Sequence, residues 1–192
     1  MFPLRQQFGD IDIYLFDQLR RGRIRPNDRI LDAGCGTGRN LVYFLNNGYD
    51  VFAVDAENRA IAKLPPDRFR AEPIEAMSFA DSFFDVVIVS AVLHFAQSDQ
   101  HFLAMLHGAW RVLKPGGLFF CRLASSIAIE AKIQPVGEGR YLLPDGSERY
   151  LVDETTLMHL TEQLGASLLD PLKTTVVQNQ RSMTTWVVRK NG

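Results

Sequence analysis

The chain has 192 residues, of which 46% are hydrophobic and 22% are charged, the proportions of a globular domain that can bury its own core. Its formal net charge of −1 argues against nucleic-acid binding, because nucleic-acid binders usually carry a basic excess. Two cysteines do not make a disulfide framework, and no apolar run is long enough to span a bilayer or to form a leader peptide. We therefore expect one cytoplasmic domain over residues 1–192, with neither membrane nor nucleic acid as a partner.

The first two thirds of the chain predict helices and strands that alternate through short links. An N-terminal segment of residues 1–28 contains helical spacing at 11–19, with Asp10 as the expected N-cap. Strands are expected at 29–33, 50–55, 68–72, 84–90 and 118–123, and helices at 40–47, 58–64 and 99–113. Because these strands are mostly apolar on both faces, they indicate a parallel sheet covered by helices on each side.

The pattern changes after residue 123. A short helix at 125–132 precedes two strands at 140–143 and 148–152, which flank a Pro-Asp-Gly turn. We interpret residues 124–152 as an insertion, a β-hairpin that acts as a lid. A helix at 153–164 and β-rich runs at 167–178 and 182–189 complete the chain.

A glycine-rich loop, Gly34–Gly38, joins the first strand to the next helix. Glycines let the backbone turn sharply and approach a ligand closely, so such a loop binds a nucleotide-type cofactor at the carboxyl edge of a parallel sheet. Arg39 stands where the dinucleotide fingerprint would have its third glycine, and Asp32 would repel a pyrophosphate. A cationic ligand suits Asp32 better, and Asp55, at the end of the second strand, is placed to accept hydrogen bonds from two ribose hydroxyls.

Four segments resemble the motifs of the class I S-adenosylmethionine-dependent methyltransferases. They are residues 30–40 (ILDAGCGTGRN), 51–55 (VFAVD), 84–95 (FDVVIVSAVLHF) and 111–117 (RVLKPGG). The resemblance implies an α/β fold, a Rossmann-like three-layer sandwich with a mostly parallel seven-stranded sheet. Its strand order would be 3-2-1-4-5-7-6, with strand 7 antiparallel and the hairpin insertion after strand 5. Residues 34–49 look closest to the tellurite-resistance-type and thiopurine-type small-molecule methyltransferases.

The same resemblance implies roles in binding S-adenosylmethionine, with S-adenosylhomocysteine as the product. Gly34, Gly36 and Gly38 would shape the loop under the methionine part, and Asp32 would hold the amino group. Asp55 would bind the ribose diol, with Ala56 beside the adenine.

Further cofactor contacts are expected around these residues. The acid that this family often has after the third strand is Pro73 here, so adenine recognition falls to Ile74 and Glu75. Cys35, Asn40 and Ser90 are the other candidate contacts, and Ser90 ends the fourth strand, where the methyl donor should sit. Arg39 lies either at the surface or against the cofactor carboxylate.

Methyl transfer is an in-line displacement from an activated leaving group, so positioning and desolvation can supply most of the catalysis. A general base is needed only for a protonated acceptor, and His94 is the candidate, with a packing role as the alternative. The other histidines lack metal-ligand spacing, so no metal is expected.

A small-molecule acceptor is expected, bound by a monomer or a homodimer. Residues 90–93 (SAVL) lack the Asn/Asp-Pro-Pro-Tyr/Phe motif of the amino-methylating DNA enzymes of this fold. The hairpin side chains Arg140, Tyr141, Arg149 and Tyr150 either line the acceptor pocket or lie exposed. Two other functions stay open: a Rossmann-type nicotinamide oxidoreductase, which the loop spacing opposes, and an S-adenosylmethionine-binding protein without transfer activity.

Overall fold

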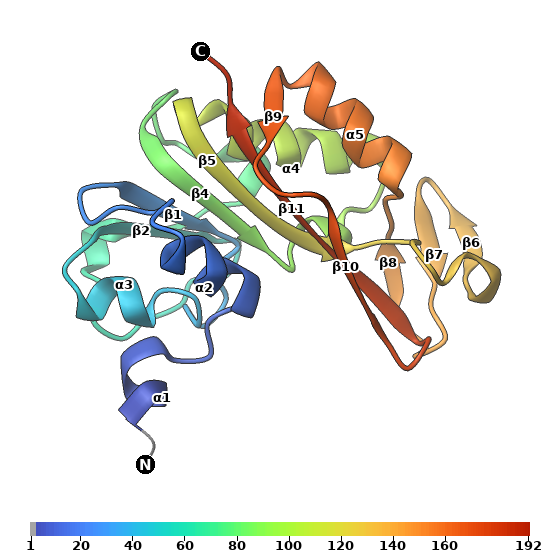
Figure 1. Cartoon of the computed structure of the whole chain (residues 1–192), viewed down its shortest axis with the longest axis horizontal. Coiled ribbons are helices and arrows are strands. Elements are labelled where there is room, and N and C mark those ends of the chain that lie inside the picture. The colour runs from blue at the N-terminus through green and yellow to red at the C-terminus, as the bar shows by residue number, and fades with distance from the viewer. Residues whose placement is uncertain (1–2) are drawn as a thin grey trace.

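A twisted mixed sheet runs through the computed structural model, which describes residues 3–192 (Figure 1). Its strands are β1 (Arg29–Ala33), β2 (Asp50–Asp55), β3 (Phe69–Ala71), β4 (Phe84–Ser90), β5 (Leu113–Ala124), β9 (Ala166–Leu168), β10 (Lys173–Val177) and β11 (Arg181–Lys190). The order β3-β2-β1-β4-β5-β11-β10, with β1 to β5 parallel and β11 antiparallel to β5, confirms the expected topology.

The edge of the sheet beside β11 is shared by two short strands. Both β9 and β10 pair antiparallel with β11, and residues 169–172 separate them. Pro171 lies in that gap, and a proline has no N–H to donate to a strand ladder. The β-rich run expected at 167–178 is therefore interrupted.

Two helical layers cover the sheet. The helices are α1 (Pro3–Phe8), α2 (Ile13–Arg20), α3 (Val42–Asn46), α4 (Asp99–Arg111) and α5 (Glu154–Gln163). Alternate residues of the central strands point to opposite faces: Ile88 and Phe120 share a core with α2 and α3, whereas Val87 and Phe119 share one with α4 and α5. Figure 1 shows the two layers on opposite sides of the sheet.

The structure differs from three expectations, about one helix N-cap and two short helices. Asp12, not Asp10, caps the first predicted helix, because its carboxylate accepts a 2.9 Å hydrogen bond from the backbone N–H of Tyr14. Residues 58–64 form turns rather than a helix, followed by a 3-10 turn η1 (Pro66–Arg68); Pro65 disfavours helical geometry at the residue before it.

Residues 125–132 also lack the expected α-helix and contain only the 3-10 turn η4 (Glu130–Lys132). The backbone N–H groups of Ser125 and Ser126 donate to Ser182 and Val152 instead, so they belong to strand-like pairing.

The insertion is a three-stranded antiparallel sheet rather than a hairpin alone. The expected hairpin is present as β7 (Arg140–Leu142) and β8 (Glu148–Tyr150), and β6 (Gln134–Gly137) adds a third strand. Tyr150 fastens this small sheet to α4: its ring stacks on Phe102 at 4.6 Å, and its hydroxyl donates to Asp99 Oδ1 at 2.9 Å.

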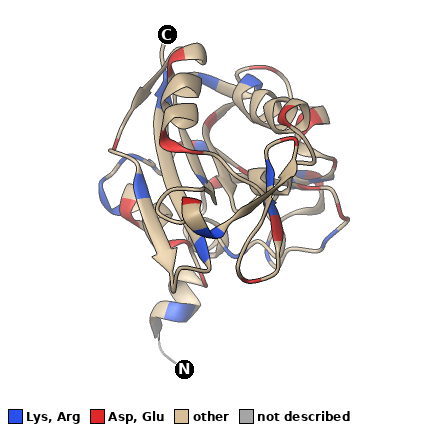
Figure 2. Cartoon of the chain, turned by 90° about the vertical axis from the view of Figure 1, so that its right-hand side faces the viewer, with Lys and Arg blue, Asp and Glu red and all other residues tan. Residues whose placement is uncertain are grey.

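The surface beside the small sheet carries both signs of charge. Figure 2 turns this side toward the viewer and shows basic and acidic positions interspersed over it. Among residues 3–192 no helix is both long and apolar enough to cross a membrane.

Candidate active site

The glycine loop leaves β1 at the point where the sheet order reverses, with β2 on one side and β4 on the other. Gly34, Gly36 and Gly38 have φ values of 75°, 54° and 74°, in the left-handed region that favours glycine. A Cβ atom on Gly34 would lie 2.5 Å from the side chain of Val92. Glycine is therefore needed there for both backbone conformation and space, and the loop lies against the end of β4.

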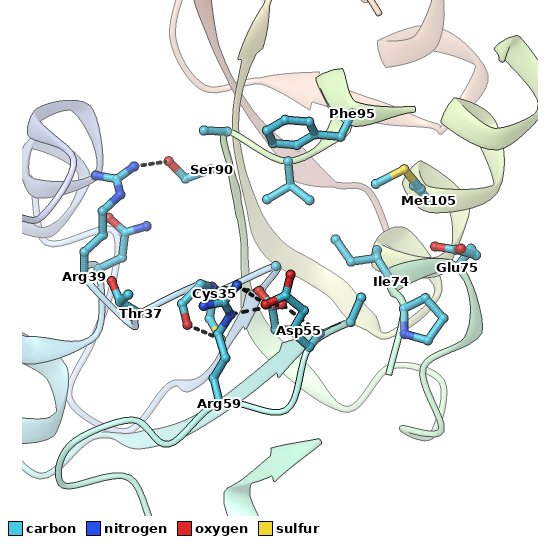
Figure 3. A pocket seen from close by; sticks show the side chains of 18 of the residues that line it. Cys35, Thr37, Arg39, Asp55, Arg59, Ile74, Glu75, Ser90, Phe95 and Met105 are labelled. Atoms are coloured by element: carbon cyan, nitrogen blue, oxygen red, sulfur yellow. Dashed lines mark hydrogen bonds and ion pairs between the residues drawn. The ribbon is translucent and has the colours of Figure 1, made fainter. Parts of the chain in front are cut away.

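A cavity of about 710 Å³ opens at the carboxyl ends of these strands (Figure 3). This is the size of a small-molecule site. The predicted cofactor contacts that line it are Gly34, Cys35, Gly36, Asn40, Asp55, Ala56, Ile74, Glu75 and Ser90. Burial raises the pKa of the Cys35 thiol, so this side chain contributes a protonated wall rather than a nucleophile.

Three predicted residues lie outside the cavity lining: Asp32, Gly38 and His94. Gly38 shapes the end of the loop, because a Cβ there would lie 2.6 Å from Ile61. The surroundings of Asp32 decide whether it can bind a cation, and those of His94 decide whether it can accept a proton.

Asp32 is the penultimate residue of β1, beneath the loop, with only 1% of its surface exposed. Its Oδ2 atom has no hydrogen-bond partner among the described residues. Burial raises the pKa of Asp32 to about 7, an effect that Arg39 opposes and Asp55 reinforces. A buried carboxylate oxygen without a partner fits a site for a cationic group.

Asp55 ends β2, contacts the loop directly and lines the cavity beside it. Its Oδ2 accepts a 2.8 Å hydrogen bond from the N–H of Gly36, and its Oδ1 accepts one of 3.1 Å from the N–H of Glu57. Arg59, which the sequence analysis did not single out, lies in the cavity wall with its Nε 3.6 Å from Asp55 Oδ1. Each carboxylate oxygen keeps a further lone pair for a ligand hydroxyl.

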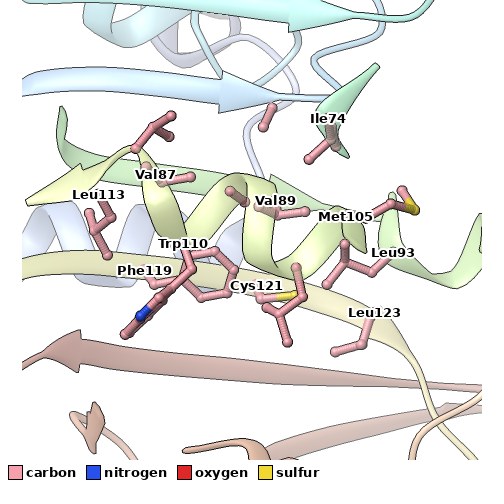
Figure 4. Packing of buried hydrophobic residues seen from close by; sticks show 14 of the residues in the cluster. Ile74, Val87, Val89, Leu93, Met105, Trp110, Leu113, Phe119, Cys121 and Leu123 are labelled. Atoms are coloured by element: carbon pink, nitrogen blue, oxygen red, sulfur yellow. The ribbon is translucent and has the colours of Figure 1, made fainter. Parts of the chain in front are cut away.

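An apolar wall closes the cavity on the far side of Asp55. The 3-10 turn η2 (Ile74–Ala76) follows Pro73, and α4 packs directly on it, with Met105 in the cavity wall beside Ile74 (Figure 4). His101 of α4, which belongs to none of the sequence motifs, also lines the cavity, and its Nε2 lies 3.4 Å from Glu75 Oε1.

The end of β4 closes the cavity opposite that wall. Arg39 donates from Nη2 to Ser90 Oγ at 3.1 Å and from Nη1 to the carbonyl of Asp10 at 3.2 Å. Arg39 therefore lines the cavity while 38% of its side chain is exposed, and its contact with the cofactor carboxylate stays a prediction. Ala91 next to Ser90 has a φ of 65°, and strained backbone of this kind is common at ligand sites.

His94 does not fit the expected role of general base. It lies on η3 (Leu93–Phe95), buried, and its Nδ1 accepts a 3.2 Å hydrogen bond from the N–H of Ala124. Burial, reinforced by the charges of Arg149 and Arg122, lowers the pKa of His94 to about 4. A neutral imidazole has one nitrogen lone pair, and in His94 this lone pair on Nδ1 already accepts from Ala124. The packing alternative therefore describes His94 better than a general base does, because His94 positions the end of β5.

Comparisons with known proteins agree with this geometry. Residues 31–121 match the family described as "Methyltransferase domain". The chain is 39% identical over 105 residues to the cypemycin N-terminal methyltransferase of a Streptomyces species, covering 50% of this chain and 42% of that protein. It is 34% identical over 129 residues to the malonyl-[acyl-carrier protein] O-methyltransferase of Enterobacter lignolyticus, covering 64% and 50%. The chain thus spans about half the length of these curated relatives.

Solved structures extend the fold match over nearly the whole chain. One is a 1,6-didemethyltoxoflavin-N1-methyltransferase from Burkholderia thailandensis with bound 1,6-didemethyltoxoflavin and S-adenosylhomocysteine. Its TM-score is 0.69 at 20% identity, covering 99% of this chain and 82% of that one. A Methanosarcina mazei S-adenosylmethionine-dependent methyltransferase gives a TM-score of 0.73 at 21% identity, with 90% and 97% coverage.

Residues 31–121 therefore match a methyltransferase domain, and the chain shares the fold of solved class I S-adenosylmethionine-dependent methyltransferases. S-adenosylmethionine is the methyl donor of this class, and S-adenosylhomocysteine is the product. The finer resemblance to tellurite-resistance-type and thiopurine-type enzymes stays a prediction.

Proposed function

We propose that this protein transfers a methyl group from S-adenosylmethionine to a small-molecule acceptor. The observation that carries the proposal is the cavity at the reversal of the sheet order, where the glycine loop and Asp55 face each other. This is the position at which open α/β sheets bind nucleotide-type ligands.

The residues around the cavity fit the parts of the cofactor. S-adenosylmethionine supplies a methyl group on a positively charged sulfur. Asp32 offers its unpartnered buried oxygen to the amino group, and the loop beneath takes the methionine chain. Asp55 accepts the ribose hydroxyls when Arg59 moves aside, and the apolar wall of Ile74 and Met105 takes the adenine ring.

The acceptor would enter beside Ser90 and Phe95, which line the cavity near the end of β4. The small sheet flanks this entrance, since Arg149 of β8 lies over the ring of Phe95 at 4.9 Å. Figure 2 shows basic and acidic positions interspersed around the sheet, a mixture that favours a small acceptor over a nucleic acid. A small bound acceptor is also present in the Burkholderia structure of the same fold.

The ribose site is tested by a matched pair of variants in one strand. Asp55→Ala should weaken S-adenosylhomocysteine binding by at least about tenfold, because hydrogen bonds to a charged group contribute about 1.5–3 kcal/mol. Asp50→Ala, at the other end of β2, removes the ion pairs with Arg29 and Arg68 and should leave this affinity within about twofold. Calorimetric dissociation constants that are equal for the wild type and Asp55→Ala would show that the ribose lies elsewhere.

Turnover separates an enzyme from a binding protein. The wild type should release S-adenosylhomocysteine when S-adenosylmethionine is incubated with a broad panel of small acceptors. Tight cofactor binding without any release above the acceptor-free blank would favour the non-catalytic alternative.

A further inference from the structure

Charge is divided unevenly around the cavity. Acidic side chains gather where the cofactor is proposed to lie: Asp32, Asp55, Glu57 and Glu75, with Arg59 among them. Arginines gather at the other end, where β4 and β5 finish and the small sheet begins: Arg39 in the cavity wall, and Arg122 and Arg149 just outside the residues that line it. The arginine end is the end proposed to admit the acceptor.

Arg122 lies on β5 directly beside Ser90 of β4. Its Nη1 lies 3.3 Å from Asp12 Oδ2, and Arg39 Nη2 lies 3.9 Å from the same oxygen. Two guanidinium groups therefore share one buried carboxylate, which leaves a net positive charge. The Nε of Arg122 is buried and has no hydrogen-bond partner within residues 3–192.

Arg149 approaches the same end of the cavity from the small sheet. Its guanidinium lies over the half-exposed ring of Phe95, which lines the cavity, and it donates to the carbonyl of Glu148. It forms no ion pair with a carboxylate of the described part of the chain. The pKa of Asp145 in the adjoining turn is lowered mainly by hydrogen bonds from Ser147, with a smaller contribution from the charge of Arg149. The planar guanidinium thus keeps donors for a ligand.

The two arginines act on the same place. Arg149 lies over Phe95 of η3, and Arg122 lies near the end of β5, where the N–H of Ala124 donates to His94 of the same turn. Besides burial, which is the largest cause, the charges of both arginines lower the pKa of His94. His94 is neutral and adds no charge of its own there.

We propose that the acceptor is an anionic small molecule whose negative group is held by Arg149 and Arg122 beside Ser90. A guanidinium binds a carboxylate or similar oxyanion through charge-assisted hydrogen bonds, often two at once. The flat face of Phe95 favours an acceptor with an apolar or planar body next to that group. This inference rests on the proposed function, because it assigns the other half of the same cavity.

The test compares acids with amides of the same shape. Calorimetry with the protein saturated by S-adenosylhomocysteine measures binding of benzoate against benzamide and of butanoate against butanamide. In at least one pair the acid should bind at least about tenfold more tightly than its amide, the size expected for one charged hydrogen-bond partner.

Two variants and one control test whether the arginines cause the preference for the acid over its amide. Arg149→Gln removes the charge over Phe95, and Arg122→Lys keeps a cation opposite buried Asp12 while it removes the Nε group. Each should reduce the preference for the acid by about tenfold without changing the affinity for S-adenosylhomocysteine. Arg140→Gln is the matched control, because Arg140 lies in the same small sheet but its charge is already paired with Glu148.

The outcomes separate the two proposals. Failure of the wild type to bind S-adenosylhomocysteine overturns the proposed function itself. Binding of S-adenosylhomocysteine with no preference for either acid, or a preference that Arg149→Gln and Arg122→Lys leave intact, overturns the anionic acceptor and leaves the cofactor site standing.

Discussion

The protonation of Asp32 makes both the stability of the protein and the affinity of the cofactor site depend on pH. Burial raises its pKa in the folded protein from 3.8 to about 7, so between these values the folded state binds more protons than the unfolded state. The stabilising contribution of this carboxyl group is therefore fully present below pH 3.8 and is lost as the pH rises through about 7. A bound cation has the opposite effect, because it favours the charged carboxylate and lowers its pKa.

Cofactor affinity should consequently rise with pH. We expect S-adenosylhomocysteine, through its ammonium group, to bind up to about tenfold more weakly for each pH unit below 7, since binding must then release a proton from Asp32. Calorimetry near pH 5.5 and pH 7.5 measures this slope, and Asp32→Asn should flatten it. A wild-type affinity that is the same at both values would remove Asp32 from cation binding.

Single residues were predictable where strand order fixes their position. Asp55 and the loop glycines occupy strand ends or a strand-to-helix turn, so their spacing alone brings them together. Arg59 and His101 enter the cavity only because of how a turn and a helix pack. His94 was assigned to the site because it follows β4, but its contact with Ala124 depends on the length of β5 and draws it out of the cavity lining.

Helix α4 and the turn η2 pack so closely that their backbones meet. A Cβ on Gly108 would lie 2.3 Å from the carbonyl oxygen of Ile74 and 3.0 Å from Glu75 Cα. The absence of a side chain at Gly108 therefore lets α4 hold the wall proposed for adenine.

Gly108→Ala should lower the free energy of unfolding by about 1–3 kcal/mol, because overlap with backbone outweighs the gain of about 1 kcal/mol in helix propensity. Ala104→Gly, at an exposed position of the same helix, calibrates the propensity, with an expected loss of about 1 kcal/mol. Urea denaturation of the three proteins measures both effects. A more stable Gly108→Ala protein would contradict the close packing.

Elements with a strong hydrophobic pattern were predicted closely, and short ones were not. The expected bounds of β4 agree with the structure, because its seven residues are nearly all buried. Every residue of β6 is exposed, so no apolar alternation marks it as a strand. The helices expected at 58–64 and 125–132 are each too short for local spacing to outweigh a proline or a competing backbone pairing.

At the scale of the whole molecule, the cavity lies where three parts of the fold meet. The sheet supplies the loop and Asp55, α4 and η2 supply the apolar wall, and the small sheet flanks the arginine end (Figures 1 and 3). The four motifs cover the loop, Asp55 and the end of β4, which is why the class of fold could be predicted from sequence, but none of them contains η2 or Met105. They do not extend into residues 124–152, where the acceptor side is built.

The central claim is that the cavity takes S-adenosylmethionine and not a dinucleotide. Calorimetry of the wild-type protein with S-adenosylmethionine, S-adenosylhomocysteine and NAD, each titrated separately at about pH 7.5, tests this directly. We predict binding of one S-adenosylmethionine or S-adenosylhomocysteine per chain and no binding of NAD, because Asp32 lies under the loop and Arg39 replaces the third glycine. Tight binding of NAD with no binding of S-adenosylmethionine would show that the cavity is a dinucleotide site.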